Sequence, residues 1–219
     1  MENEVGLEEG NEECNSSNSI EYIGTMKGGL PHGMGTASFP NGDRYVGEFA
    51  YGAMEGKGTM TYGAEGGCGS YVGDWRGGLR EGKGFRQFEG GSSYKGYWMG
   101  GMMHGKGVYT ISNEATYYGD FKNNMFDGKG VLSLVSGRSY DGGWSESKMH
   151  GNGIEKYANG NYIMCRYWKG EKIGFWTMYS SEGVILFQEG SAQQKPRGDC
   201  GRTSKFLGNK SLFKEDHFK

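Results

Sequence analysis

Hydrophobic and polar residues alternate along this chain in short stretches that recur about every 23 residues. In the stretch YVGEF at residues 45–49 the alternation has a period of two, which places Tyr45, Gly47 and Phe49 on one face of a β-strand. A turn follows, and the same alternation resumes at Gly56. Each stretch therefore predicts a β-hairpin, and turn signals such as Asn-Gly lead toward the next one.

The recurrence is regular over most of the chain. Two residues after each of the first six aligned tyrosines comes a glycine, a large apolar residue stands two residues further on, and a G-x-G pair follows later. A fixed period of this length is typical of repeat architectures. The aligned tyrosines are Tyr22, Tyr45, Tyr71, Tyr94, Tyr117, Tyr140 and Tyr162, and the large apolar residues are Met26, Phe49, Trp75, Trp98, Phe121 and Trp144.

A single hairpin cannot bury an aromatic face, but neighbouring hairpins stacked side by side can. We therefore predict an all-β fold: one elongated, twisted, single-layer antiparallel sheet of stacked β-hairpins. We expect roughly 13 or 14 strands spanning about 60–70 Å.

The repeats also predict a register across each hairpin. If Phe49 faces Gly56, then Glu48 faces Lys57 on the opposite face of the sheet, and the acid and the lysine form a cross-strand ion pair. A position without a side chain opposite each Phe or Trp leaves room for its ring. The same register pairs Gly47 with Gly58, Asp74 with Lys83 and Asp120 with Lys129, and it leaves Lys106 opposite Tyr97.

The segment GGLREGKG at residues 77–84 nearly matches a phosphate-binding loop. Such a loop needs Ser or Thr after its lysine and lies between a strand and a helix. Here Gly84 follows the lysine, no helical periodicity comes after it, and a similar match recurs at residues 100–107. These glycines therefore belong to the repeat and do not indicate nucleotide binding.

The pattern Y-x-G-x-[WF]-x-x-G-x-x-x-G-x-G resembles the MORN (membrane occupation and recognition nexus) repeat family. The resemblance covers residues 22–190, and six units carry it in register. In the seventh unit Met164 and Arg166 replace the glycine and the aromatic residue, so we expect this unit to cap the sheet. The resemblance implies hairpin arrays that serve as assembly modules rather than as catalysts.

The two ends of the chain differ from the repeats in composition. Residues 1–21 hold seven Glu and no Lys or Arg, and we expect an acidic, disordered N-terminal tail there. Residues 191–219 hold seven Lys or Arg and three acidic residues, which predicts a basic C-terminal tail. Its apolar residues, such as Phe206 and Phe213, could form a docking segment that orders on a partner.

Composition narrows the class of protein. The 15 Tyr, 11 Phe and 5 Trp argue against disorder, and the 44 glycines lack the three-residue period of collagen. A net charge of −2 does not favour nucleic acid as a partner. The four cysteines are widely spaced, and no apolar run reaches the length of a membrane span. We expect a soluble intracellular protein without disulfide bonds.

His32, His104 and His150 share one repeat position. Equivalent positions in successive hairpins lie two strands apart, about 9.6 Å, whereas metal ligands must converge to bonds of about 2 Å. We therefore expect these histidines to support turns, and we expect no metal site, no cofactor, no catalytic residues and no enzymatic activity.

Two surfaces are candidates for binding. The first is the aromatic and glycine face, which would suit a helix or an extended segment of another protein. The second is a stripe of lysines on the opposite face, which could contact anionic lipid headgroups. The residues of the aromatic face are Tyr71, Trp75, Tyr94, Trp98, Tyr117, Tyr140 and Trp144, and those of the lysine stripe are Lys57, Lys83, Lys106 and Lys129.

The resemblance to family members that consist almost entirely of repeats, such as radial-spoke-head proteins, implies a scaffold in a cytoskeletal assembly. We expect partners among the proteins of a ciliary or flagellar axoneme. The alternative is a peripheral membrane adaptor that binds anionic phospholipids through the lysine stripe. Because an open sheet has two free edges, a homodimer is also conceivable.

Overall fold

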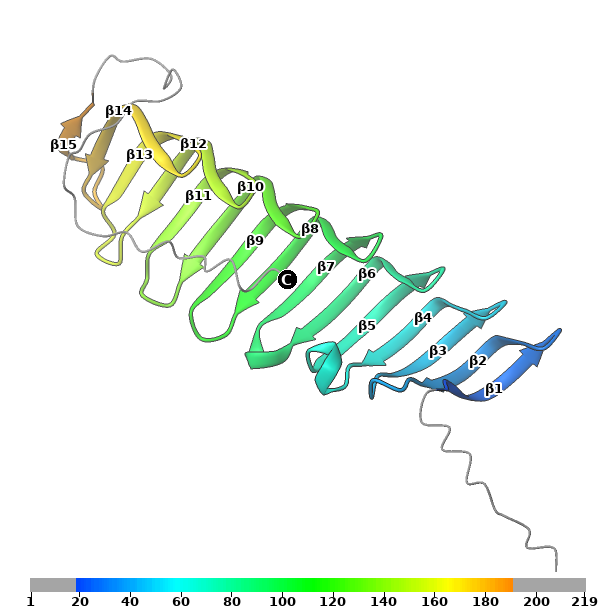
Figure 1. Cartoon of the computed structure of the whole chain (residues 1–219). Coiled ribbons are helices and arrows are strands. Elements are labelled where there is room, and N and C mark those ends of the chain that lie inside the picture. The colour runs from blue at the N-terminus through cyan, green and yellow to red at the C-terminus, as the bar shows by residue number, and fades with distance from the viewer. Residues whose placement is uncertain (1–18, 191–219) are drawn as a thin grey trace, which may run out of the picture.

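The computed structural model describes residues 19–190, which form one antiparallel sheet of 15 strands (Figure 1). The strands follow one another across the sheet in sequence order, which confirms the predicted array of hairpins. The predicted tails at residues 1–18 and 191–219 lie outside the described residues. The strands are β1 Glu21–Lys27, β2 Leu30–Ser38, β3 Arg44–Ala50, β4 Ala53–Thr61, β5 Gly69–Arg76, β6 Leu79–Phe88, β7 Ser93–Met99, β8 Met102–Ile111, β9 Ala115–Lys122, β10 Met125–Leu134, β11 Ser139–Ser145, β12 Lys148–Lys156, β13 Tyr162–Trp168, β14 Glu171–Tyr179 and β15 Ile185–Glu189.

Helical structure within residues 19–190 is limited to two short 3₁₀ turns, η1 at Ala64–Gly66 and η2 at Glu89–Gly91. Both lie in links between hairpins. No helix among these residues is long and apolar enough to cross a membrane.

Each hairpin turns through two residues with positive φ. This geometry is that of a type I′ turn, whose twist matches the twist of the strands on either side. Because the loop is only two residues long, β4 begins at Ala53, three residues before the predicted Gly56. The turn residues are Gly28 and Gly29, Tyr51 and Gly52, Gly77 and Gly78, Gly100 and Gly101, Asn123 and Asn124, Glu146 and Ser147, and Lys169 and Gly170.

The register inside each hairpin differs from the prediction. In β3–β4, Gly47 pairs with Gly58, but a bulge follows, and Phe49 then pairs with Met54 instead of Gly56. The glycine that faces each large ring belongs to the preceding hairpin, as Trp75 and Gly56 show in β4–β5. The corresponding pairs are Phe49–Gly33, Trp98–Gly82, Phe121–Gly105, Trp144–Gly128 and Tyr167–Gly151.

A row of paired glycines crosses the first twelve strands, and the tyrosine rings lie on it. A Cβ added at Gly47 would be 2.5 Å from the hydroxyl oxygen of Tyr45 and 2.5 Å from Cα of Gly58. The Tyr45 hydroxyl donates a hydrogen bond to the carbonyl oxygen of Glu48 at 3.0 Å, and this bond holds the ring against the paired glycines. The row consists of Gly24, Gly35, Gly47, Gly58, Gly73, Gly84, Gly96, Gly107, Gly119, Gly130, Gly142 and Gly153.

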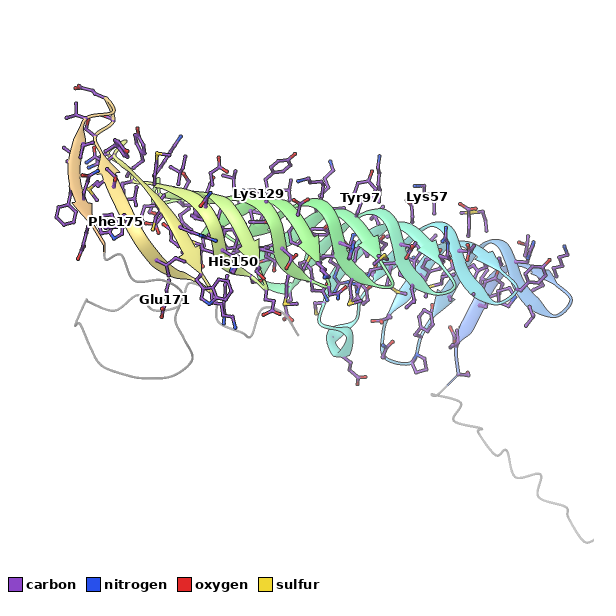
Figure 2. All side chains as sticks on the ribbon, turned by 90° about the horizontal axis from the view of Figure 1, so that it is seen from above. Lys57, Tyr97, Lys129, His150, Glu171 and Phe175 are labelled. Carbon is purple, nitrogen blue, oxygen red and sulfur yellow. The ribbon has the colours of Figure 1, made fainter. Side chains whose placement is uncertain are left out.

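The rings form the core of the sheet. From the second hairpin to the sixth, each repeat tyrosine meets the large ring of its own hairpin and that of the next one edge-on; Tyr71, for example, lies 5.1 Å from Trp75 and 5.3 Å from Trp98 between ring centroids. Edge-to-face contacts at this distance are favourable beyond the area they bury. The strands wind obliquely around the long axis of the sheet, and side chains such as Lys57, Tyr97 and Lys129 point outward (Figure 2). The aromatic face is the buried one.

The seventh hairpin aligns one residue later than predicted. Ile163, and not Tyr162, takes the buried tyrosine position and is 2% exposed. Cys165 pairs with Gly153 and so occupies the glycine position, and Tyr167 supplies the large ring, 5.2 Å from the Tyr140 ring. Tyr162 lies on the outer face and stacks on Tyr179.

Candidate functional site

The seven residues of the predicted aromatic binding face are buried in the core. Their exposed fractions lie between 0% and 5%: Tyr71 0%, Trp75 5%, Tyr94 0%, Trp98 3%, Tyr117 0%, Tyr140 4% and Trp144 4%. The expectation that these rings form an accessible surface is therefore not met, because the rings pack against one another in the core cluster. Binding of a partner to these side chains stays a prediction, and it would require the sheet to open.

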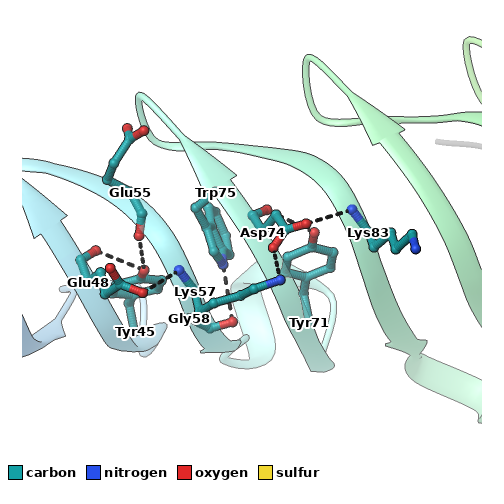
Figure 3. A network of polar contacts seen from close by, with 9 residues as sticks. All are labelled: Tyr45, Glu48, Glu55, Lys57, Gly58, Tyr71, Asp74, Trp75 and Lys83. Carbon is teal, nitrogen blue, oxygen red and sulfur yellow. Dashed lines mark hydrogen bonds and ion pairs between the residues drawn. The ribbon is translucent and has the colours of Figure 1, made fainter.

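The lysine stripe lies on the outer face, but its ion pairs differ from the predicted ones. Glu48 does not pair with the Lys57 ammonium; its carboxylate accepts a hydrogen bond from the Lys57 backbone N–H at 2.9 Å. The Lys57 ammonium forms an ion pair with Asp74 of the next hairpin (Figure 3). Asp74 in turn accepts the backbone N–H of Lys83 at 2.8 Å.

The same arrangement recurs along the array. Lys106, which the predicted register left unpaired, forms an ion pair with Asp120 of the next hairpin at 2.7 Å. Asp120 accepts the backbone N–H of Lys129 at 3.0 Å. Lys83 faces Tyr97, with its ammonium 5.6 Å from the ring centroid, and Lys129 faces Gly143. The acids thus join neighbouring hairpins, and two of the four lysines already have a carboxylate partner.

The position shared by the three histidines supports the turn of the next hairpin. Where a carboxylate stands there, it accepts a turn N–H: Glu55 from Gly77 and Glu81 from Gly100, both at 2.9 Å. Where histidine stands there, its ring can contact the next turn, as His32 does with the turn residue Tyr51 at 5.1 Å between ring centroids. No group of three or more potential metal ligands occurs within residues 19–190.

An exposed apolar row on the outer face is the accessible surface that the sequence analysis missed. It runs across the strands through the residue that follows each repeat tyrosine and the residue paired with it, for example Val46 with Thr59 and Val72 with Phe85. The exposed large side chains of this outer-face row are Ile23 78%, Val46 37%, Val72 50%, Phe85 37%, Tyr118 59% and Met164 48%. The alternation predicted that these residues face away from the rings, but not that they line up in one row.

One charged side chain lies in the core without a charged partner. Arg86 is 6% exposed, and its Nε and Nη1 find no hydrogen-bond partner among the described residues. Its guanidinium lies 3.6 Å from the centroid of the Tyr62 ring, so a cation–π contact replaces an ion pair. Burial lowers the pKa of Arg86 below its ordinary value.

The family model of the MORN repeat matches residues 22–44, 45–64, 71–93, 94–116, 117–137 and 140–162, more than half of the chain. The chain belongs to the MORN repeat family. The six matched MORN repeats correspond to the six hairpins from β1–β2 to β11–β12, and β13 to β15 extend the array beyond them. MORN repeats suggest binding of proteins or of membrane lipids.

Other comparisons add little to this assignment. No curated protein matches the chain. Among solved structures, the chain is similar to a point mutant of the TCP10 domain of Danio rerio CPAP, with 10% identity and a TM-score of 0.28, over 73% of this chain and 84% of that chain.

Proposed function

We propose that this MORN repeat protein is a non-enzymatic scaffold that holds other proteins in a cytoskeletal assembly. The observation that carries the proposal is the outer-face row, in which large apolar side chains are 37% to 78% exposed on strands between β1 and β13, with Lys95 of β7 and Asp141 of β11 interrupting the row. Exposed apolar patches of this extent, bordered by charges, are typical of protein interaction sites. The row is presented by a rigid sheet, so it can hold several partners or one long partner at fixed spacing.

We further propose that the assembly is a ciliary or flagellar axoneme, with a role similar to that of radial-spoke components. The support is the resemblance to family members that are almost all repeat. Affinity capture with the full chain, followed by mass spectrometry, should recover axonemal proteins from ciliated cells and not from non-ciliated cells. Recovery of the same unrelated proteins from both cell types would reject the axonemal assignment.

Two double variants, one inside the outer-face row and one outside it, distinguish this row from other surfaces. Val72→Lys with Tyr118→Lys places two charges in the row, at positions that are 50% and 59% exposed. Leu79→Lys with Val135→Lys adds the same charge outside the row, at positions that are 53% and 77% exposed. We expect only the first pair to abolish partner capture, with circular dichroism unchanged for both. Equal capture by both pairs would exclude the row as the binding surface.

The alternative function, a membrane adaptor, is favoured by one observation: the lysines of the stripe stay accessible even where they are paired. The Lys57 side chain is 74% exposed and that of Lys106 is 59% exposed. If this alternative holds, the protein should float with vesicles of anionic phospholipid at low salt, and charge reversal of Lys57, Lys83 and Lys106 should abolish flotation. Absence of flotation at low salt would remove it.

A further inference from the structure

The outer edge of β1 is a regular strand edge along which another strand could pair. In every other hairpin the first strand pairs with the preceding hairpin along a ladder without a bulge; in β2–β3, for example, this ladder runs without interruption from Ser38–Arg44 to Gly33–Phe49. Residues 21–26 of β1 correspond to residues 44–49 of β3, so β1 presents the same regular edge, and no strand within residues 19–190 lies beside it. Open, regular edges are templates for pairing with another chain.

The residues at this edge are apolar and exposed. Ile20, Ile23 and Met26 are 60%, 78% and 55% exposed, and six of the seven β1 residues are classed as exposed. The opposite edge is different, because β15 has only five residues and a register shift between Met178 and Tyr179 that leaves Leu186 outside the pairing. Short strands and bulges are the devices that prevent edge pairing.

The number of strands decides which edges can meet. Because 15 is odd and all neighbours are antiparallel, β1 and β15 point in the same direction. A head-to-tail contact that kept the aromatic faces on one side would therefore need parallel pairing of β15 with β1. A twofold axis perpendicular to the sheet instead brings β1 against a second β1 in antiparallel register, which is the isologous arrangement of a closed dimer.

The sequence of β1 is complementary to itself about Gly24. In the register that aligns Gly24 with Gly24 of a second copy, Glu21 faces Lys27 of that copy, and the glycine row continues across the junction. Opposite charges that face each other across two strands are favourable, and this register contains two such pairs. The register also places Met26 opposite Tyr22, where a flexible thioether fits against an aromatic ring.

Met26 stands at a repeat position where the other hairpins have an aromatic ring, and this difference agrees with the twofold register. The other six hairpins carry Phe, Trp or Tyr at this position, and each of those rings faces a glycine of the preceding hairpin. In the twofold register the residue opposite is Tyr22 and not glycine, so a large ring would collide there.

We infer that the protein forms a twofold homodimer through β1, with the two sheets joined into one continuous 30-stranded antiparallel sheet. The inference does not depend on the identity of any other partner. Because one strand pair is a small interface, below the ~1,000 Å² of stable complexes, dimerisation is concentration-dependent. The bulged β15 edges lie at both far ends, so assembly stops at the dimer and does not continue into a filament.

The test uses charge exchange in the full chain, followed by sedimentation equilibrium over a range of concentrations. Glu21→Lys places lysine opposite Lys27 at both ends of the junction, and Lys27→Glu places two acids opposite each other. Each single variant should weaken the dimer about tenfold or more. The double variant E21K/K27E should restore it, and an equimolar mixture of the two single variants should form a heterodimer.

The rescue separates dimerisation from a structural effect, because Glu21 and Lys27 are exposed and lie at opposite ends of one strand, about 20 Å apart. They cannot contact each other within one chain. Leu186→Lys, at the β15 edge, is the control and should leave the dimer unchanged. A monomer at all soluble concentrations, growth into filaments, or a dimer that responds to Leu186→Lys and not to the charge variants would overturn the inference.

Discussion

Adding one methyl group to the glycine row gives a direct test of how the core is built. At Gly107 a new Cβ would lie 2.5 Å from both Cε2 and the hydroxyl oxygen of Tyr94. No heavy atoms tolerate that distance, so the ring must move. Tyr94 has little room to do so, because it is 0% exposed and its ring lies 5.1 Å from Trp98 and 4.9 Å from Phe121.

Whether Gly107→Ala raises or lowers the stability distinguishes two explanations of the glycine row. If the glycines only marked weak strand positions, Gly107→Ala would stabilise the protein by about 0.5–1 kcal/mol. If the ring needs the space, overpacking costs about 1–3 kcal/mol, and loss of the 2.9 Å hydrogen bond from the Tyr94 hydroxyl to the Tyr97 carbonyl oxygen adds about 1 kcal/mol. We expect a net loss of about 2–4 kcal/mol.

A double-mutant cycle assigns this loss to the ring. Tyr94→Ile removes the ring and should cost about 3–5 kcal/mol by leaving a cavity. With isoleucine at position 94, the added methyl at position 107 no longer meets the ring, so the double variant should be about as stable as Tyr94→Ile alone. The coupling free energy should therefore equal the whole loss, about 2–4 kcal/mol.

The free energies of unfolding are measured by urea denaturation followed by circular dichroism. Gly100→Asn is the control, because Gly100 has φ +56° with nothing within 4 Å of an added Cβ, and Asn123 occupies the equivalent turn position. The control should stay within about 0.5 kcal/mol of wild type. A Gly107→Ala variant as stable as wild type, or strictly additive effects in the cycle, would refute the ring-on-glycine explanation.

Three further predictions follow from charged and titrating groups. The hydrogen bond from the Lys57 side chain lowers the pKa of Asp74. The Asp74 carboxylate therefore stabilises the fold above about pH 4, and this contribution is lost as the pH falls through the lowered pKa. Asp74→Asn should flatten the acid side of a plot of Tm against pH, by only a few tenths of a kcal/mol because the carboxylate is 31% exposed. Burial raises the pKa of Tyr45 to about 12, so its stabilising effect is complete below about pH 10 and is lost as the pH rises. The Tm measured against pH should therefore begin to fall above about pH 10. Arg86→Met should leave thermal stability equal or higher, because it removes an unpaired buried charge at a position where β4 has Met60. A fall in the free energy of unfolding of more than about 2 kcal/mol would show that the cation–π contact with Tyr62 dominates.

The sequence was sufficient to predict the hairpins, their order and the pairing of Gly47 with Gly58, because the period-two alternation assigns each side chain to a face. It did not reveal which neighbouring strand a side chain meets, since every strand from β2 to β14 has an antiparallel neighbour on both sides. The two-residue turn at Tyr51 and Gly52 held the missing information. It fixes Ala50 opposite Ala53, and a bulge is then needed to align the two glycines.

The burial of the aromatic face could not be read from the alternation. A pattern of faces does not specify how strongly a sheet curls, and the curl decides whether rings such as Trp98 line an open surface or a closed core. The lysine partners were missed for a related reason. Once the bulge shifts the register, Lys57 points toward the next hairpin, so acids and lysines that recur together in the sequence join different hairpins in the structure.

The seventh hairpin shows within this one chain that the ring and the glycine depend on each other. Where Ile163 replaces the repeat tyrosine, no ring lies across the strands, and Cys165 stands at the glycine position. Met164 of β13 pairs with Thr177 of β14 as Val46 pairs with Thr59. Trp176 of β14 therefore stands where β4 has glycine. The three positions change together, because the space that the tyrosine ring leaves must be refilled by other side chains. The glycines of this array are therefore requirements of packing, imposed by the rings that lie on them.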